Sequence, residues 1–250
     1  MYILRHYANA TINLTKHALA FQLFACLAWL WDMAVWTNDS LDLVLRRSRN
    51  VRCNCCGWKG NRFFLQTHIT GTRVYRSREM CPKCLSLGRQ RQLAQYLTDY
   101  TRLLSLDSPR ILEIGPSRAD VQWLRRQGLK NIVIVDIIYG AASIIMDITR
   151  AAFKDNVFDA VICSHVLEHV PSDTMALKEI LRVMKTGGVC VIQVPIQTGL
   201  QDTLEYGIPR PNEFGHVRAY GADFTSRLRS AGFEVVHTRE GLFEVTKTGP

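Results

Sequence analysis

Residues 109–250 alternate apolar runs with amphipathic segments, and this alternation constrains the fold more than any other feature. Runs that are apolar throughout indicate strands buried on both faces, as in parallel sheets. Apolar residues three or four positions apart indicate helices. The pattern predicts an α/β fold with a Rossmann-like, mainly parallel seven-stranded sheet between helices. The expected strands are RILEIG, NIVIVD, ASIIMDI, VFDAVICS, GVCVIQVPI, FEVVHT and LFEVTKT, and the expected helices are RADVQWLRRQGL, SDTMALKEILRVMKTGG ending at Gly187, and GADFTSRLRSAG.

Glycine and polar residues stand where the first four strands end, and ligands of such sheets bind at that edge. Gly115 permits a ligand to approach the backbone closely. Asp136 follows 21 residues later, where a carboxylate can accept two hydrogen bonds from ribose hydroxyls. Two glycines of the dinucleotide-binding turn are replaced by Ser117 and Asp120, so NAD is a less expected ligand. The third and fourth strands end at Asp147, Ser164 and His165.

Five of the eight cysteines lie between residues 53 and 84. Cys53, Cys56, Cys81 and Cys84 have the spacing C-x2-C-x24-C-x2-C, and each C-x2-C pair can wrap two thiolates around one metal ion. Four thiolates in a tetrahedral array suit Zn²⁺. The intervening FFLQTHITGTRVYR predicts two strands joined by a Gly-Thr turn, which is a zinc-ribbon layout. Four protein ligands leave no open position, so we expect a structural site.

Other interpretations of these cysteines remain open. Cys55 could replace Cys56 as the ligand, although Cys56 reproduces the spacing of the second pair. His68 could replace one cysteine. A redox pair or free thiols are the alternative to a metal site.

The net charge of +9 is unevenly distributed along the chain. Residues 1–108 contain 15 Lys and Arg against 6 Asp and Glu, whereas residues 109–250 contain 16 of each kind. A basic first half suggests an anionic partner, either RNA or a membrane surface, and the alternative is an ordinary solvated surface.

Residues 18–31 read ALAFQLFACLAWLW and are too short an apolar run for a confident membrane span. Within residues 18–36 we weigh a helix packed on the protein or a dimer partner, a helix in a membrane interface, and a true span. The expected organisation is a helical segment at 1–50, a zinc-ribbon-like module at 51–86, a linking helix at 87–108 and a cofactor domain at 109–250. The expected location is the cytoplasm, with peripheral membrane contact as a further option.

The motifs LEIGPSRAD, VDI, MDIT, FDAVICSHVLEHV and LRVMKTGGVCVIQVP follow one another in that order. Together they resemble the class I S-adenosylmethionine (SAM) dependent methyltransferases, in particular the type 11 family. The CxxC…CPxC segment, SLGRQRQL and the late HVRAYGADFTSRLRSAGF are similar to a subgroup with an N-terminal zinc ribbon.

This resemblance implies SAM as co-substrate and a role for each residue at the strand ends. Glu113, Gly115 and Pro116 would line the methionine and ribose region. Asp136 and Ile137 would bind the ribose side, Asp147 would face the adenine amino group, and Ile148 would lie against the ring. Ser164 and His165 would flank the sulfonium. The sequence departs from the family at Pro116-Ser117, which replaces the usual glycine-rich stretch, and a second departure is the Cys-Ser-His end of the fourth strand.

Methyl transfer to a hydroxyl or protonated amine needs a base, and His165, His169 and His216 are the candidates. His165 follows the strand end directly and is favoured, whereas Glu168 and His169 are expected to hold the loop that follows the fourth strand. The segment 197–221 is expected to be a lid or substrate loop. Three function classes remain: a methyltransferase for a small molecule, sugar or lipid; an RNA methyltransferase that grips RNA through the basic ribbon; and a non-catalytic binding protein on the same fold.

Overall fold

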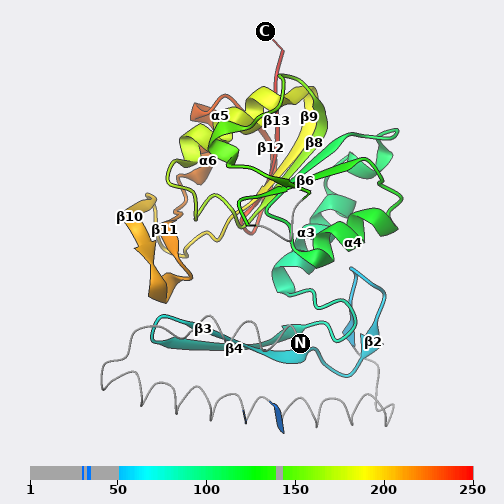
Figure 1. Cartoon of the computed structure of the whole chain (residues 1–250), viewed down its shortest axis with the longest axis vertical. Helices are drawn as coiled ribbons and strands as arrows, with labels where there is room; N and C mark the ends of the chain where they lie inside the picture. Colours follow the sequence, from blue (N-terminus) through cyan, green and yellow to red (C-terminus); the bar gives the residue numbers. More distant parts are fainter. Residues whose placement is uncertain (1–29, 31–32, 35–50, 139–142, 250) are drawn as a thin grey trace.

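The computed structural model describes residues 30, 33–34, 51–138 and 143–249. Its centre is a seven-stranded sheet in the order β12-β13-β9-β8-β5-β6-β7 (Figure 1). Adjacent strands are parallel except for β13, which is antiparallel to both of its neighbours. The predicted fold class is therefore confirmed. The strands are Ile111–Ile114 (β5), Ile132–Asp136 (β6), Ile144–Ile145 (β7), Phe158–Ser164 (β8), Met184–Gln193 (β9), Glu234–Arg239 (β12) and Leu242–Thr246 (β13).

Helices cover both faces of this sheet (Figure 1). Side chains alternate along a strand, so Ile111 packs with the helices of one face and Leu112 with those of the other. The first face is covered by Gly88–Asp99 (α3) and Arg118–Arg126 (α4), and the second by Asp173–Val183 (α5) and Phe224–Ser230 (α6). Three short 3₁₀ turns are Leu103–Ser105 (η1), Ile148–Arg150 (η2) and Pro211–Glu213 (η3).

The second expected helix was placed too far toward the C-terminus. Helix α5 ends at Val183, and β9 begins at Met184, so Gly187 does not end the helix. The reason is tertiary: Met184 pairs with Phe158 of β8, and the amide of Gly187 donates to the carbonyl of Lys247 at 2.9 Å. Gly187 has a φ of +68° and serves the irregularity in β9 rather than a helix end.

Three two-stranded sheets lie beside the central one (Figure 1). The cysteine-rich segment contains the pair Val51–Arg52 (β1) and Lys59–Gly60 (β2) and the hairpin Phe64–Thr70 (β3) and Arg73–Met80 (β4). The segment expected as a lid loop contains a hairpin of its own, Leu204–Arg210 (β10) and His216–Ala219 (β11). The turn of β3–β4 contacts this second hairpin, because the Thr72 amide donates to Asn212 Oδ1 at 2.8 Å.

Most of the predicted N-terminal helix lies outside the described residues. Of residues 18–36 only Leu30, Met33 and Ala34 are described, and they are helical with exposed side chains. Among the helices that the structure describes, none has the length and apolar character needed to cross a membrane.

One buried arginine joins β11 to the loop that follows β8. Arg218 is 2% exposed, and its Nη1 donates to the carbonyls of Leu167 (2.6 Å) and Val170 (2.7 Å). Its Nη2 donates to the carbonyl of Pro171 at 3.0 Å, and its Nε donates to the Glu205 carboxylate at 3.0 Å. This one side chain therefore satisfies three carbonyls of the loop and links them to the β10–β11 hairpin.

We predict that Arg218→Met lowers the free energy of unfolding by about 3–5 kcal/mol, because it leaves three carbonyls of the loop without their donor. The measurement is urea unfolding followed by circular dichroism. The matched control is Arg125→Met on the exposed side of α4, which should change stability by less than about 0.5 kcal/mol. Equal effects of the two substitutions would contradict the role of Arg218.

Candidate functional site

The turn between β5 and α4 is built around Gly115. Its φ is +60°, and an added Cβ would lie 2.6 Å from Val166 Cγ2, so a larger residue is strained for two reasons. The two residues that replace the glycines of a dinucleotide-binding turn form a local structure. The Ser117 hydroxyl accepts from the Asp120 amide at 3.2 Å, and the Ser117 amide donates to the Asp120 carboxylate at 3.0 Å. This capping box begins α4 directly after the glycine turn.

Asp136 and Asp147 lie at the ends of neighbouring strand segments, as expected from the sequence. Asp136 Oδ1 accepts from the Ile138 amide at 3.1 Å, and Asp147 Oδ1 accepts from the amide and hydroxyl of Thr149, both at 2.8 Å. Ile137 is 68% exposed beside Asp136. Ile148 instead belongs to the buried core. Their assignment to a cofactor stays a prediction.

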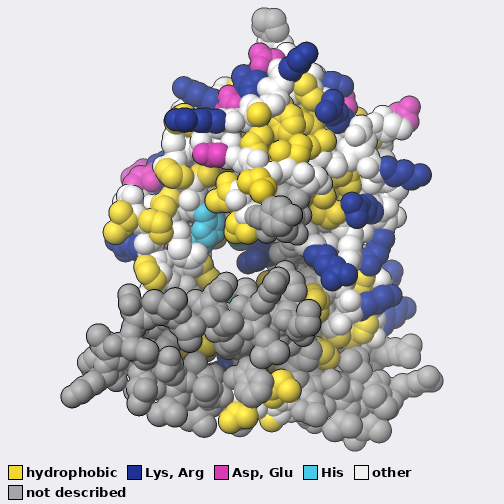
Figure 2. Space-filling view, viewed as in Figure 1, with side chains coloured by type: hydrophobic (Ala, Val, Ile, Leu, Met, Phe, Trp, Pro, Cys, Tyr) yellow, Lys and Arg dark blue, Asp and Glu magenta, His cyan; other side chains and the backbone are white. Residues whose placement is uncertain are grey.

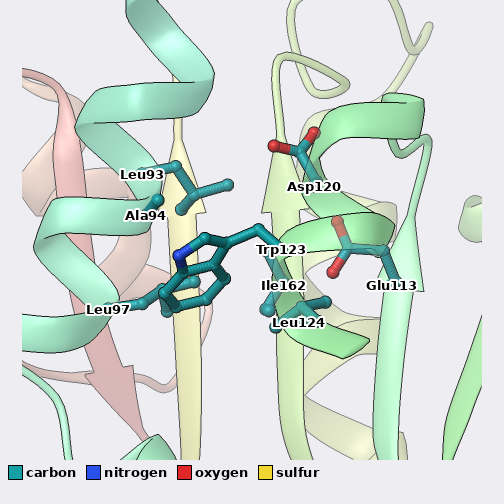
Figure 3. A pocket seen from close by; sticks show the side chains of 8 residues that line it. All are labelled: Leu93, Ala94, Leu97, Glu113, Asp120, Trp123, Leu124 and Ile162. Carbon is teal, nitrogen blue, oxygen red and sulfur yellow. The ribbon is translucent and has the colours of Figure 1, made fainter. Parts of the chain in front are cut away.

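Glu113 is fully buried, and its carboxyl group points into a cavity of about 10 Å³ between α3 and α4 (Figure 3). The cavity is otherwise lined mainly by apolar side chains, and Asp120 is the second carboxyl group there. Neither oxygen of Glu113 has a hydrogen-bond partner in the described part of the chain. Burial, followed by the charge of Asp120, raises the pKa of Glu113 well above its ordinary value. The protonated form is therefore favoured in the folded protein.

The loop after β8 begins in a strained conformation. His165 has a φ of +55°, and its amide donates to the carbonyl of Gln193 at 2.8 Å. Ser164 is tied to the same residue, because its hydroxyl donates to Gln193 Oε1 at 2.7 Å. His165 Nδ1 lies 3.1 Å from Glu168 Oε1. If Nδ1 carries the proton, Nε2 remains free to accept one.

The structure brings His216 to this same loop, although 51 positions separate it from His165. The rings of His169 and His216 lie 4.8 Å apart at 81°, and the Val217 amide donates to the Glu168 carbonyl at 2.9 Å. Burial lowers the pKa of His216. Glu168 and His169, expected to hold the loop, share a cluster with His216 in which the potential ligand atoms lie within 4.8 Å of one another. The HVLEH motif could have suggested that Glu168 and His169 lie together, but the sequence does not show that His216 of β11 joins them.

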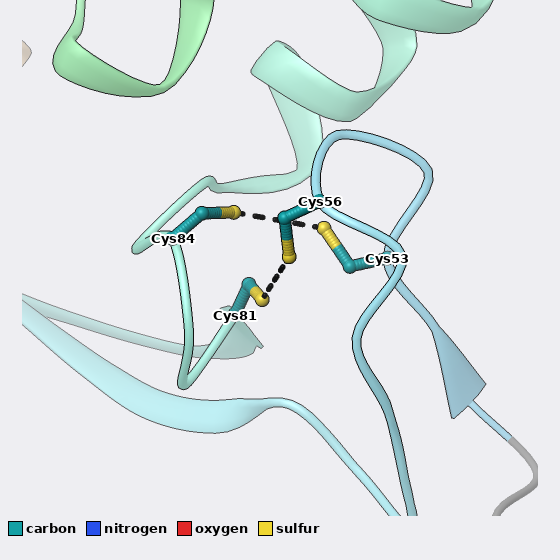
Figure 4. Close-up of side chains that lie close together, drawn as sticks. All are labelled: Cys53, Cys56, Cys81 and Cys84. Atoms are coloured by element: carbon teal, nitrogen blue, oxygen red, sulfur yellow. Dashed lines mark hydrogen bonds between the residues drawn. The ribbon is translucent and has the colours of Figure 1, made fainter. Parts of the chain in front are cut away.

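The structure also brings together the four cysteines selected by spacing (Figure 4). The Sγ atoms of Cys53 and Cys84 are 3.7 Å apart, and those of Cys56 and Cys81 are 3.6 Å apart. A tetrahedral zinc ion with bonds of about 2.3 Å places its sulfur ligands about 3.8 Å apart. The thiol of Cys55 is not part of this group of four and donates to the carbonyl of Gln90 at 3.7 Å.

His68, the other alternative ligand, is part of β3 and packs edge-on against Phe214 at 6.1 Å between ring centres. The structure therefore groups Cys56, and neither Cys55 nor His68, with the other three cysteines.

A family model described as a methyltransferase domain matches residues 87–238, which is more than half of the chain. The chain belongs to this methyltransferase family. The match begins at Leu87, so it includes α3 as well as the central sheet. The predicted enzyme class, a SAM-dependent methyltransferase of class I, is confirmed. No match was found among curated proteins.

Several solved structures are similar to this chain at low sequence identity. The 1,6-didemethyltoxoflavin-N1-methyltransferase of Burkholderia thailandensis, solved with S-adenosylhomocysteine, is 16% identical with a TM-score of 0.52, over 65% of this chain and 79% of that one. A possible histamine N-methyltransferase of Thermotoga maritima is 18% identical (TM-score 0.45; 62% and 87% covered). The [4+2]-cyclase SpnF is 22% identical (TM-score 0.44), and the match covers 58% of this chain and 57% of SpnF.

We predict that Glu113→Gln removes a pH dependence of stability. A raised pKa means that the folded state binds a proton that the unfolded state releases above about pH 4.3, so the wild type loses stability as pH rises from there toward the folded pKa. Glutamine does not titrate. The stability of Glu113→Gln relative to wild type should therefore be greater at pH 8 than at pH 5, as measured by urea unfolding. The exposed Glu240→Gln is the control, and identical pH profiles for Glu113→Gln and wild type would contradict the assignment.

Proposed function

We propose that this methyltransferase transfers a methyl group from SAM to a small acceptor, a soluble molecule, sugar or lipid, that is held between the carboxyl edge of the sheet and the β10–β11 hairpin. The observation that carries the proposal is that β11 places His216 beside the loop that ends β8. The side of the site expected to receive the acceptor is therefore covered by a hairpin. A covered site suits a small acceptor better than a folded macromolecule.

The residues at the sheet edge fit the cofactor. Gly115 gives a backbone turn without a side chain, Asp136 supplies a carboxylate at the end of β6, and the exposed Ile137 supplies an apolar surface next to it. SAM supplies an electrophilic methyl group when bound. Asp136 would bind and orient the ribose, and Ser164 and His165 would lie near the sulfonium. We also assign Asp147 to the adenine amino group.

His165 and His216 are the proposed proton acceptors. Glu168 orients His165 through the 3.1 Å contact with Nδ1, which leaves Nε2 for the acceptor. The depressed pKa of His216 keeps that imidazole neutral near pH 7. The neutral imidazole of His216 can therefore take a proton from an acceptor.

We further propose that Cys53, Cys56, Cys81 and Cys84 hold one structural Zn²⁺, and that the chain belongs to the zinc-ribbon subgroup of the type 11 family. The ribbon supports the hairpin. Tyr75 of β4 packs against Phe214 with ring centres 5.0 Å apart, and Arg73 Nη1 lies 2.8 Å from Glu213 Oε1. The ribbon would thereby fix the position of the hairpin that carries His216.

Recruitment of an anionic partner, RNA or a membrane surface, is a second proposal. Strand β4 carries exposed arginines at positions 73, 76 and 78. In Figure 2 the Lys and Arg side chains continue down the side where α4 lies, and no acidic side chain is visible low on that side. Exposed Arg118, Arg125 and Arg126 of α4 add to this charge. A partner bound to this basic surface would be concentrated near the enzyme, and it would not need to enter the site.

The function is tested by offering methyl-labelled SAM with separate pools of RNA, lipid and soluble metabolites. We expect label in the metabolite or lipid pool. Asp136→Ala should weaken SAM binding by about 1–3 kcal/mol, measured by calorimetry, because it removes charged hydrogen bonds to the ribose. The exposed Asp107→Ala is the control. Label in RNA alone would reject the small-acceptor proposal, and unchanged affinity in Asp136→Ala would reject the ribose assignment.

Metal analysis of protein purified under reducing conditions tests the ribbon. We expect one zinc per chain bound to the cysteines, and we expect Cys56→Ser to lower zinc occupancy and destabilise residues 53–84. Cys55→Ser should retain the zinc, because its sulfur faces the Gln90 carbonyl. Limited proteolysis measures the local destabilisation. Zinc-free wild-type protein that resists proteolysis equally well would contradict a structural site.

A further inference from the structure

We propose that Glu168, His169 and His216 bind a divalent transition-metal ion at the acceptor side of the site. One ligand atom from each residue lies within 4.8 Å of the others. Ligands of one ion with bonds of about 2.1 Å lie about 3–4 Å apart, so a small closure of the side chains completes the site. The role of the ion rests on the proposed methyl transfer, but its binding does not.

One carboxylate oxygen of Glu168 is available to coordinate a metal ion. Its side chain is 1% exposed, and only Oε1 has a partner, the imidazole of His165 at 3.1 Å. Oε2 is buried and has no hydrogen-bond partner among the described residues. Burying a carboxylate oxygen without a partner is costly, and a cation or a coordinated metal is the usual compensation. The nearby guanidinium of Arg218 is directed to the loop carbonyls and Glu205.

The two histidines supply the remaining ligands, so that with the ion bound His216 is a ligand and His165 alone takes the proton. Their rings are nearly perpendicular, with centres 4.8 Å apart, so they are not stacked and a nitrogen of each can face a common point. His216 is partly buried and His169 is exposed, so the cluster opens to solvent on one side. Two imidazoles and one carboxylate form a ligand set that leaves open coordination positions, unlike the closed set of four cysteines.

The backbone holds these ligands in place. The Val217 amide donates to the Glu168 carbonyl, and Arg218 binds the carbonyls on both sides of Glu168 and His169. The loop and β11 are thus fixed to each other before any ion arrives. His165 completes the arrangement from outside, because it contacts the other oxygen of Glu168 and can orient that carboxylate.

An ion at this position would favour an acceptor with a hydroxyl group. Two adjacent hydroxyls suit the site best, because both can occupy open coordination positions of the ion. The cation would lower the pKa of such a hydroxyl. In the transfer, the O–H proton goes to His165, a new O–CH₃ bond forms, and the S–CH₃ bond breaks with its electron pair left on sulfur. The products are a methyl ether and S-adenosylhomocysteine.

The test titrates Co²⁺ into the full-length protein after zinc in the cysteine site has been measured and retained. We expect one equivalent of Co²⁺ with the weak visible bands of nitrogen and oxygen ligands and no thiolate charge-transfer band. His216→Ala and Glu168→Gln should each weaken Co²⁺ binding at least about tenfold. His237→Ala on β12, outside the cluster, is the matched control and should bind as the wild type does.

SAM affinity, measured by calorimetry on each variant, reports whether the fold and the cofactor side are intact. Co²⁺ affinity that is the same in wild type and His216→Ala, or no bound equivalent in wild-type protein that binds SAM, would overturn the metal site. Cobalt binding without methyl transfer to any hydroxylated pool would leave the metal site standing and reject the proposed acceptor class.

Discussion

The contact between Arg218 and the loop after β8 determines what the rest of the site can do. A parallel sheet places the ends of β5, β6 and β8 at one edge, but it does not place anything opposite them. Arg218 does so, because it satisfies three carbonyls of the loop and simultaneously binds Glu205 on the neighbouring strand of its hairpin. Asp173 reinforces this arrangement at the start of α5, where it accepts from Tyr220 and Arg227. The β10–β11 hairpin is consequently tied by hydrogen bonds to the loop after β8.

The cysteine-rich segment is joined to the same structure at both ends. Near the cysteines, Arg126 of α4 donates to the Cys55 carbonyl at 2.9 Å, and the cysteines share an apolar core with α3. At the far end, the β3–β4 turn meets η3, where a Cβ on Gly71 would lie 2.1 Å from Asn212 Oδ1. The close approach requires glycine at this turn, which also has a φ of +55°. The cysteine-rich segment therefore spans from α3 and α4, which cover one face of the sheet, to the β10–β11 hairpin.

Sequence reasoning succeeded where a local pattern was sufficient. Continuous apolar runs predicted the sheet, and Gly115 and Asp136 lie at its edge as expected, because strand ends in a parallel sheet meet at one edge. It failed where tertiary contacts determine where an element ends. The end of α5 depends on pairing between Met184 and Phe158, which no helix-end signal in the sequence reveals.

The β10–β11 hairpin was hidden for a similar reason. Its segment is rich in glycine and proline, and its pairing shifts register between Glu205 and Arg210, so it lacks the regular alternation of a strand. Without that hairpin the sequence could not show that His216 meets Glu168 and His169. The cysteine cluster was easier to predict, because all four ligands are close enough in the chain for spacing to identify them.

The two candidate metal sites differ in the number of coordination positions that their ligands leave open. Four thiolates close a tetrahedron and leave nothing for a substrate, so that site can only stabilise structure. The carboxylate and two imidazoles come from two separate elements and leave positions open, so that site can only serve chemistry if those elements are held together. Both the ribbon, through Arg73 and Glu213, and the core, through Arg218, hold the hairpin that carries His216. The structural site would then act on the chemical one by fixing the position of a single ligand, without contact between the two ions.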